Sequence, residues 1–261
     1  MSYESLPKLL EKLKSSPRVK GLFTTGSTAS RLAPYSDIDL VVILDKNAEE
    51  LRAVYTTIEK HFSDIFFFDV EFLDKVKKMN KVPANSFEGM LLSWLMKGRI
   101  EHDPDGLLTN LKKIATSTKL VIPSSEKAEV LTRINYGLIA NRRYLSSDDA
   151  AYHAALELRL LYSVIELVTA YFTLRDIPWR GEKDAIQFLA VHDPEYRDLL
   201  FACMRSISLK EKMRGYEVLF QKTVTDPEQI WKADFVVPVP QDRNAADMKS
   251  LLEFWKNLAD N

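Results

Sequence analysis

The sequence predicts an α+β protein with two parts: a mixed β-sheet domain with flanking helices at residues 1–122, followed by an all-α helical bundle at residues 123–261. At 261 residues the chain exceeds the usual size of one domain and is long enough for two cores. Its first half alternates apolar strand-like runs with helical patterns, whereas its second half contains only helical patterns. The segment Ile122-Pro-Ser-Ser interrupts these patterns and marks the predicted boundary.

The first domain begins with a helix at residues 5–15, in which leucines recur at helical spacing. The other elements that we predict there are a strand at 19–25, one or two helical turns at 28–32, a strand at 38–44, a helix at 47–61 capped by Asn47, a strand at 65–73, a helix at 86–96, a short strand at 99–102 and a helix at 107–115. The strand at 38–44 ends in an unbroken apolar run, which is typical of a strand covered on both faces.

Two long helices, at residues 126–145 and 149–174, dominate the second domain. The second is apolar almost all round, so we expect it at the centre of the bundle. Its few polar residues form a narrow stripe that either faces solvent or lines a cleft: Arg159, Ser163, Glu166 and Thr173. Further helices are predicted in the segments 176–190 and 248–258.

Composition excludes several classes of protein. The chain has 36 Lys and Arg against 37 Asp and Glu, and this near-neutral balance argues against a nucleic-acid partner and a polymerase role. Its single cysteine, Cys203, cannot form an internal disulfide, which suits a reducing cytosol. The N-terminus does not resemble a signal peptide, and no apolar stretch is long enough to cross a bilayer. We therefore expect a soluble cytoplasmic protein without a membrane partner.

A glycine-serine pair and two aspartates form the most informative stretch. Gly26 and Ser27 end the first strand, where a close backbone approach and a serine hydroxyl suit a phosphate. Asp37 and Asp39 open the second strand and share one of its faces. Two such carboxylates need a cation, a shared proton or a base between them. Oxygen ligands without nearby Cys or His favour Mg²⁺, which usually also binds substrate phosphates.

This pattern resembles the nucleotidyltransferase superfamily that includes DNA polymerase beta and the antibiotic adenylyltransferases. The shared pattern is a hydrophobic strand, Gly-Ser, a polar connection and Asp-hydrophobic-Asp-hydrophobic, here Gly26-Ser27 followed by Asp37-Ile38-Asp39-Leu40. The resemblance implies a nucleotidyltransferase-type sheet domain, a nucleoside triphosphate as substrate and a third carboxylate on a neighbouring strand.

Asp69 fits that third position best in the strand expected at 65–73, because charged residues in an apolar strand are costly unless they are paired or bind metal. Asp37, Asp39 and Asp69 would then hold Mg²⁺. Glu71 lies about 6.6 Å further along the same face, from about 3.3 Å per residue. Glu71 is either the general base, the metal ligand in place of Asp69, or a rim carboxylate paired with a lysine.

Two basic residues are candidates for phosphate contacts. Arg31 follows the glycine-serine pair and either reaches the triphosphate or is a solvated charge. Residues 161–205 are similar in motif order to the C-terminal domain of aminoglycoside adenylyltransferases of the streptomycin-spectinomycin kind. That resemblance implies that Lys183 contacts the nucleotide phosphates from the second domain; the alternative is a surface lysine near a helix start.

The implied activity is magnesium-dependent transfer of a nucleoside monophosphate, with ATP as the expected donor of AMP, to the hydroxyl of a small molecule, with release of pyrophosphate. An aminoglycoside-like acceptor is the closest analogy, but a fold does not determine its substrate. Two alternatives stay open: an antitoxin-type adenylyltransferase that modifies a protein, and a catalytically silent nucleotide-binding or interaction module. The acceptor, the preferred nucleobase and the oligomeric state do not follow from the sequence.

Overall fold

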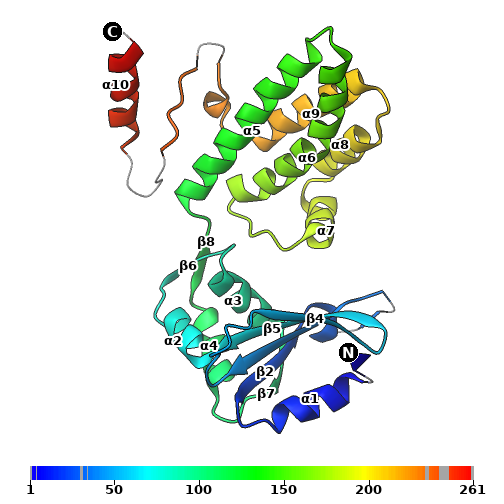
Figure 1. Ribbon diagram of the computed structural model, residues 1–261, viewed down its shortest axis with the longest axis vertical. Helices are drawn as coiled ribbons and strands as arrows, with labels where there is room; N and C mark the ends of the chain where they lie inside the picture. Colours follow the sequence, from blue (N-terminus) through cyan, green and yellow to red (C-terminus); the bar gives the residue numbers. More distant parts are fainter. Residues whose placement is uncertain are drawn as a thin grey trace. The chain divides into compact units, whose positions relative to one another are not determined.

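The computed structural model describes residues 2–3, 5–29, 32–33, 35–232, 235–240 and 247–259. The chain divides into two compact units, Met1–Val121 and Ile122–Asn261 (Figure 1). The first unit combines a β-sheet with flanking helices, and the described part of the second consists of helices and connecting segments. The predicted α+β fold class is therefore confirmed.

A mixed sheet forms the centre of the first unit (Figure 1). Its strand order is β1 (Ser2–Tyr3), β4 (Ala53–Ile58), β5 (His61–Asp69), β3 (Ile38–Leu44), β2 (Val19–Thr25) and β7 (Arg99–His102). β3 runs parallel to β5, and β1 runs parallel to β4, whereas the other neighbouring pairs are antiparallel. The parallel pair β3–β5 places the N-terminal ends of these two strands at the same edge of the sheet.

Strand periodicity divides the apolar residues of this sheet between two cores. Leu40 and Val42 face a cluster that includes Leu9 and Leu10 of α1 (Leu6–Lys14). Val41 and Ile43 project from the opposite face and belong to the second cluster. This cluster packs under α2 (Val70–Lys77), α3 (Phe87–Lys97) and α4 (Leu107–Ala115). A short parallel pair, β6 (Lys81–Pro83) and β8 (Lys119–Val121), completes the unit. The sheet thus has helices on both faces, as the unbroken apolar run of β3 indicates.

The prediction of a helix at residues 47–61 is wrong. Residues 53–58 form β4, which is joined to β5 by the two residues Glu59 and Lys60, both with positive φ. The sequence Val-Tyr-Thr-Thr-Ile is rich in β-branched and aromatic residues, and its strand preference outweighs the helical spacing of its apolar positions. Asn47 does cap a local turn, because its side chain exchanges hydrogen bonds with the backbone of Leu51.

The strand predicted at residues 65–73 begins and ends earlier, at His61 and Asp69. Helix α2 follows at once because the side chain of Asp69 accepts a hydrogen bond from the amide of Phe72 (2.9 Å) and so caps the helix. Glu71 is therefore helical and does not share a strand face with Asp69.

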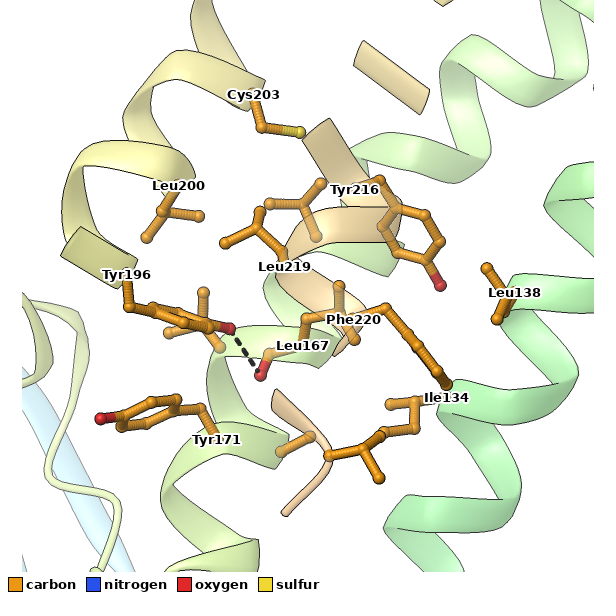
Figure 2. Packing of buried hydrophobic residues seen from close by; sticks show 14 of the residues in the cluster. Ile134, Leu138, Leu167, Tyr171, Tyr196, Leu200, Cys203, Tyr216, Leu219 and Phe220 are labelled. Carbon is orange, nitrogen blue, oxygen red and sulfur yellow. Dashed lines mark hydrogen bonds between the residues drawn. The ribbon is translucent and has the colours of Figure 1, made fainter. Parts of the chain in front are cut away.

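Five helices form the core of the second unit: α5 (Ser124–Leu145), α6 (Ala150–Leu174), α7 (Glu182–His192), α8 (Pro194–Arg205) and α9 (Leu209–Thr223). The two long helices predicted from the sequence are confirmed as α5 and α6. In the core, the hydroxyl of Tyr196 donates to the carbonyl of Leu167 (3.2 Å) (Figure 2). The same hydroxyl forms a hydrogen bond with the hydroxyl of Thr223 (2.9 Å). The last described helix is α10 (Met248–Ala259).

Three residues of the polar stripe of α6, Arg159, Ser163 and Glu166, contact side chains of α5. Ser163 is 1% exposed and accepts a hydrogen bond from Asn141 of α5, which in turn accepts one from Arg159. Conversely, Leu158 and Leu161 on α6 are each 65% exposed, so this helix is not buried all round as predicted. Within the described ranges, the structure contains no helix with the length and apolar character that crossing a bilayer requires.

Candidate functional site

The turn after β2 requires a glycine. Gly26 begins the short 3₁₀ helix η1 (Gly26–Ala29) with a φ of +58°, a conformation that side-chain-bearing residues rarely adopt. Thr25 pairs with Asp39 across the sheet, so Gly26 lies directly beside that aspartate. A Cβ atom on Gly26 would collide with Oδ2 of Asp39. Both the backbone conformation and the space therefore select glycine.

Hydroxyl groups of η1 form hydrogen bonds that connect this turn to the start of β3. The side chains of Ser27 and Thr28 donate to the carbonyl of Asp37 (3.3 and 3.4 Å), and the amide of Asp39 donates to the hydroxyl of Thr28 (3.0 Å). On the other side, Nδ1 of His61, the first residue of β5, lies 2.7 Å from the carbonyl of Ser36. The backbone around both aspartates is thus fixed from two neighbouring elements, and we had not predicted the contribution of His61.

Asp37 and Asp39 lie two residues apart, and Asp39 shares a strand face with Val41 and Ile43, which contact the core under α2, α3 and α4. Asp37 is exposed and Asp39 is partly buried. At the same edge, the hydroxyl of Thr25 donates to the carbonyl of Trp94 near the end of α3 (3.2 Å). The carboxylates therefore lie at the open edge of a face that is otherwise covered by helices.

A third carboxylate joins this face from the neighbouring strand. Asp64 of β5 pairs with Asp39 of β3 in the parallel register, so their side chains project from the same face. Oδ1 of Asp64 is buried and has no hydrogen-bond partner within the described structure. Desolvation, followed by the negative charge of Asp37, raises the pKa of Asp64. An unsatisfied carboxylate oxygen beside two more carboxylates is the environment that a cation would stabilise.

The structure does not bring Asp69 to this site. Asp69 pairs with Leu44 at the opposite end of the strands, five residues or about 17 Å from Asp64 at about 3.3 Å per residue. Its oxygens accept from the amides of Phe72 (2.9 Å) and Asn47 (3.3 Å). Asp69 and Glu71 instead line a separate surface pocket at that end. This differs from the expected triad of Asp37, Asp39 and Asp69, because strand β5 begins four residues earlier than predicted.

One sequence signal could have identified Asp64. It directly precedes the apolar run Ile65-Phe66-Phe67-Phe68, just as Asp39 precedes its own apolar run. The sequence pattern predicts that the strand begins at Ile65, after Asp64. The pairing between Asp39 and Asp64 depends on the parallel register, which is not visible in the sequence.

Two basic residues, Arg31 and Lys183, are predicted from the sequence to contact the phosphates. Arg31 lies outside the described residues. Lys183 is exposed near the N-terminal end of α7 in the second unit. The phosphate contacts predicted for these two residues remain predictions.

The donor set fits a hard cation, although the described side chains do not already form a closed metal cluster. No group of three His, Cys, Asp or Glu residues in the described ranges is arranged as a metal site. Since like charges repel, carboxylates on adjacent strands draw together only around a cation or a shared proton. The exposed side chain of Asp37 has the freedom to turn toward its partners.

Part of the first unit is similar to a known protein family. Residues 6–97 match a family model. That family is the nucleotidyltransferase domain. The match contains Gly26, Ser27 and all three carboxylates of the cluster, and it ends before the helical unit begins.

A solved structure also resembles the chain: a nucleotidyltransferase-like protein from Exiguobacterium sibiricum, with a TM-score of 0.44 and 13% sequence identity. The alignment covers 84% of this chain and 74% of that one. A comparison with curated proteins gave no significant match. Residues 6–97 are therefore similar to nucleotidyltransferase domains, whose general activity is transfer of a nucleoside monophosphate.

Proposed function

We propose that this protein transfers a nucleoside monophosphate, with AMP from ATP as the first donor to test, to the hydroxyl of a small molecule and releases pyrophosphate. One observation carries the proposal. Asp37, Asp39 and Asp64 project from one face of two parallel strands, beside the Gly26-Ser27 turn, within the matched nucleotidyltransferase domain. We therefore propose Asp64 as the third carboxylate, in place of the Asp69 expected from the sequence.

The three carboxylates would hold Mg²⁺, because hard oxygen donors suit this cation and the buried Oδ1 of Asp64 lacks another partner in the described structure. When bound, the cation supplies positive charge that stabilises the attacking and leaving oxygens. Ser27 and the backbone amides of η1 are proposed to orient the outer phosphates. Arg31 and Lys183 are further candidates for these phosphates.

In the proposed reaction, the acceptor hydroxyl oxygen forms a bond to the α-phosphorus while the bond between that phosphorus and the pyrophosphate oxygen breaks. The hydroxyl proton passes to a carboxylate, for which we propose Asp64. Asp64 lies on β5, directly opposite Asp39, and its Oδ1 has no hydrogen-bond partner in the described structure. Glu71, the base suggested by the sequence, lies on α2 near the other end of β5, where it lines a different pocket.

A paired substitution tests this assignment. The rate of pyrophosphate release from Mg²⁺ and each nucleoside triphosphate is measured with a panel of hydroxyl compounds. We expect Asp64→Asn to lower the rate by about 10²-fold or more, because it removes both a base and a ligand. Asp69→Asn, the matched control on the same strand, should retain the rate.

If Asp69→Asn lowered the rate and Asp64→Asn did not, Asp69 would belong to the mechanism and Asp64 would be excluded from it. Nucleotide binding by the wild-type protein without any pyrophosphate release would indicate a silent binding module. Labelled nucleotide that appears on a protein band, and not on a small compound, would show the antitoxin-type activity instead.

A further inference from the structure

Two aromatic side chains are exposed beside the carboxylate cluster. Tyr55 of β4 is 65% exposed and Phe62 of β5 is 59% exposed. Their rings are nearly parallel, at 9°, with centroids 6.3 Å apart. Large exposed aromatic faces are unusual on a strand pair unless another molecule covers them.

The strand register places this pair next to Asp64. Tyr55 lies directly opposite Asp64 in the antiparallel ladder between β4 and β5, and Phe62 precedes Asp64 by two residues. All three side chains therefore project from one face, the face that also carries Asp39. Thr57, which is exposed and pairs with Phe62, adds a hydroxyl to the same surface. We call Tyr55, Thr57 and Phe62 the aromatic platform.

The order of the strands separates two regions of this face. The Gly26-Ser27 turn follows β2, Asp37 and Asp39 are at the start of β3, Asp64 is on β5, and the platform continues onto β4. In phosphoryl transfer the attacking and leaving oxygens lie roughly in line on opposite sides of the phosphorus. If the outer phosphates lie by the turn after β2, the leaving pyrophosphate is on that side. The attacking hydroxyl must then approach from β5 and β4.

We propose that the aromatic platform binds the acceptor, and that the acceptor carries its hydroxyl on a pyranose-sized polyol ring. This inference rests on the proposed function for the direction of attack. Such a ring has an apolar face that packs on aromatic side chains and hydroxyls around its rim. One rim hydroxyl would point to Asp64 while another meets the hydroxyl of Thr57. The platform thereby selects a ring over an open-chain alcohol.

Binding in the presence of a non-hydrolysable triphosphate tests the platform without turnover. The protein, saturated with Mg²⁺ and an α,β-methylene analogue of ATP, is titrated with methyl glucoside and inositol as ring probes and with glycerol as the open-chain probe. Saturation-transfer NMR detects weak binding of each probe. The variants are Tyr55→Phe, Tyr55→Thr and the double variant Tyr55→Thr with Phe62→Thr; threonine preserves strand preference. Thermal unfolding verifies that each variant is folded.

We expect at least one ring probe to bind the wild-type protein and Tyr55→Phe alike, and more tightly than glycerol. The double variant should bind that probe about tenfold more weakly, which corresponds to about 1.4 kcal/mol, because both aromatic contacts are removed. Affinity for the triphosphate analogue should be unchanged in all variants. With an active acceptor, the double variant should raise KM for the acceptor and leave kcat nearly unchanged.

Three results would overturn the proposal. The first is no ring binding by the wild-type protein, or equal binding by the double variant. The second is loss of affinity for the triphosphate analogue in the double variant, which would place the nucleobase on these rings. The third is a wild-type dimer that the double variant abolishes, which would show that a second copy covers them. If ring binding depends on the platform but no triphosphate binds, the platform stands and the transferase function fails.

Discussion

At the scale of single residues, the candidate site depends on close approaches between backbone and carboxylate. Gly26 adopts a positive φ and leaves room for Oδ2 of Asp39. Thr28 bonds both to the carbonyl of Asp37 and to the amide of Asp39. Small changes here should therefore alter the positions of the carboxylates as well as the stability of the domain.

Gly26→Ala should destabilise the protein by about 1–3 kcal/mol, because alanine is strained at positive φ and its Cβ would collide with Asp39. Gly106→Ala is the matched control: Gly106 also has a positive φ (+69°), but its added Cβ would meet no atom closer than 3.7 Å. Denaturant unfolding measures both variants. We expect the larger loss at Gly26, together with weaker triphosphate binding; equal losses would show that the contact with Asp39 is unimportant.

The raised pKa of Asp64 predicts a pH-dependent stability. Asp64 holds its proton more tightly in the folded than in the unfolded chain, so its ionisation destabilises the fold as the pH rises above the ordinary carboxyl value of 3.8. Asp64→Asn should therefore be slightly more stable than the wild-type protein at neutral pH. The difference should shrink as the pH falls through the raised pKa and disappear below 3.8. Chemical unfolding over this pH range measures the free energy of unfolding of both proteins. A difference between them that does not change with pH would contradict the prediction.

At the scale of secondary-structure elements, the junction between β5 and α2 decides which acidic residue reaches the site. The strand carries Asp64 at one end and Asp69 at the other, and Asp69 ends the strand by capping the helix. The sequence predicts a helix over residues 47–61 in place of the β4–β5 hairpin, because Val54 and Ile58 also fit helical spacing. Propensity read along the chain could not show that Tyr55, Thr56 and Thr57 pair with β5.

Loss of the Asp69 cap should affect stability and not the site. Asp69→Ala should cost about 1 kcal/mol in the free energy of unfolding, because the amide of Phe72 loses its partner. Asp69→Asn can still accept this hydrogen bond and should cost less. Thermal or chemical unfolding measures the two variants, and triphosphate binding serves as the control. A loss of binding in either variant would indicate a longer-range effect of α2 on the carboxylates.

At the scale of the whole molecule, each unit has its own hydrophobic clusters. The cluster of the second unit runs from Val130 to Val224, and those of the sheet unit draw their buried members from residues before Ile122. Figure 2 shows the tyrosines and leucines that fill the helical core. Two separate cores predict that a cavity in one unit unfolds mainly that unit.

Leu167→Ala, at a fully buried position of α6, should destabilise the helical unit by about 2–5 kcal/mol. Hydrogen exchange should accelerate in α5 to α9 and remain slow in β2, β3 and β5. Leu92→Ala, at a position 1% exposed in α3, is the reciprocal control and should accelerate exchange in the sheet unit. Equal acceleration in both units for either variant would show that they unfold together.

The sequence by itself determined the α+β class, the strands around Gly26 and Asp39, and the long helices of the second half, because these depend on local periodicity and on the apolar run of each element. It also indicated a nucleotidyltransferase pattern in the region that the family model matches. Only the tertiary structure decided that Asp64 and not Asp69 lies beside Asp39, and that Tyr55 adjoins it. Pairing between strands is a long-range property, and shifting a strand by five residues exchanges one end of the sheet for the other.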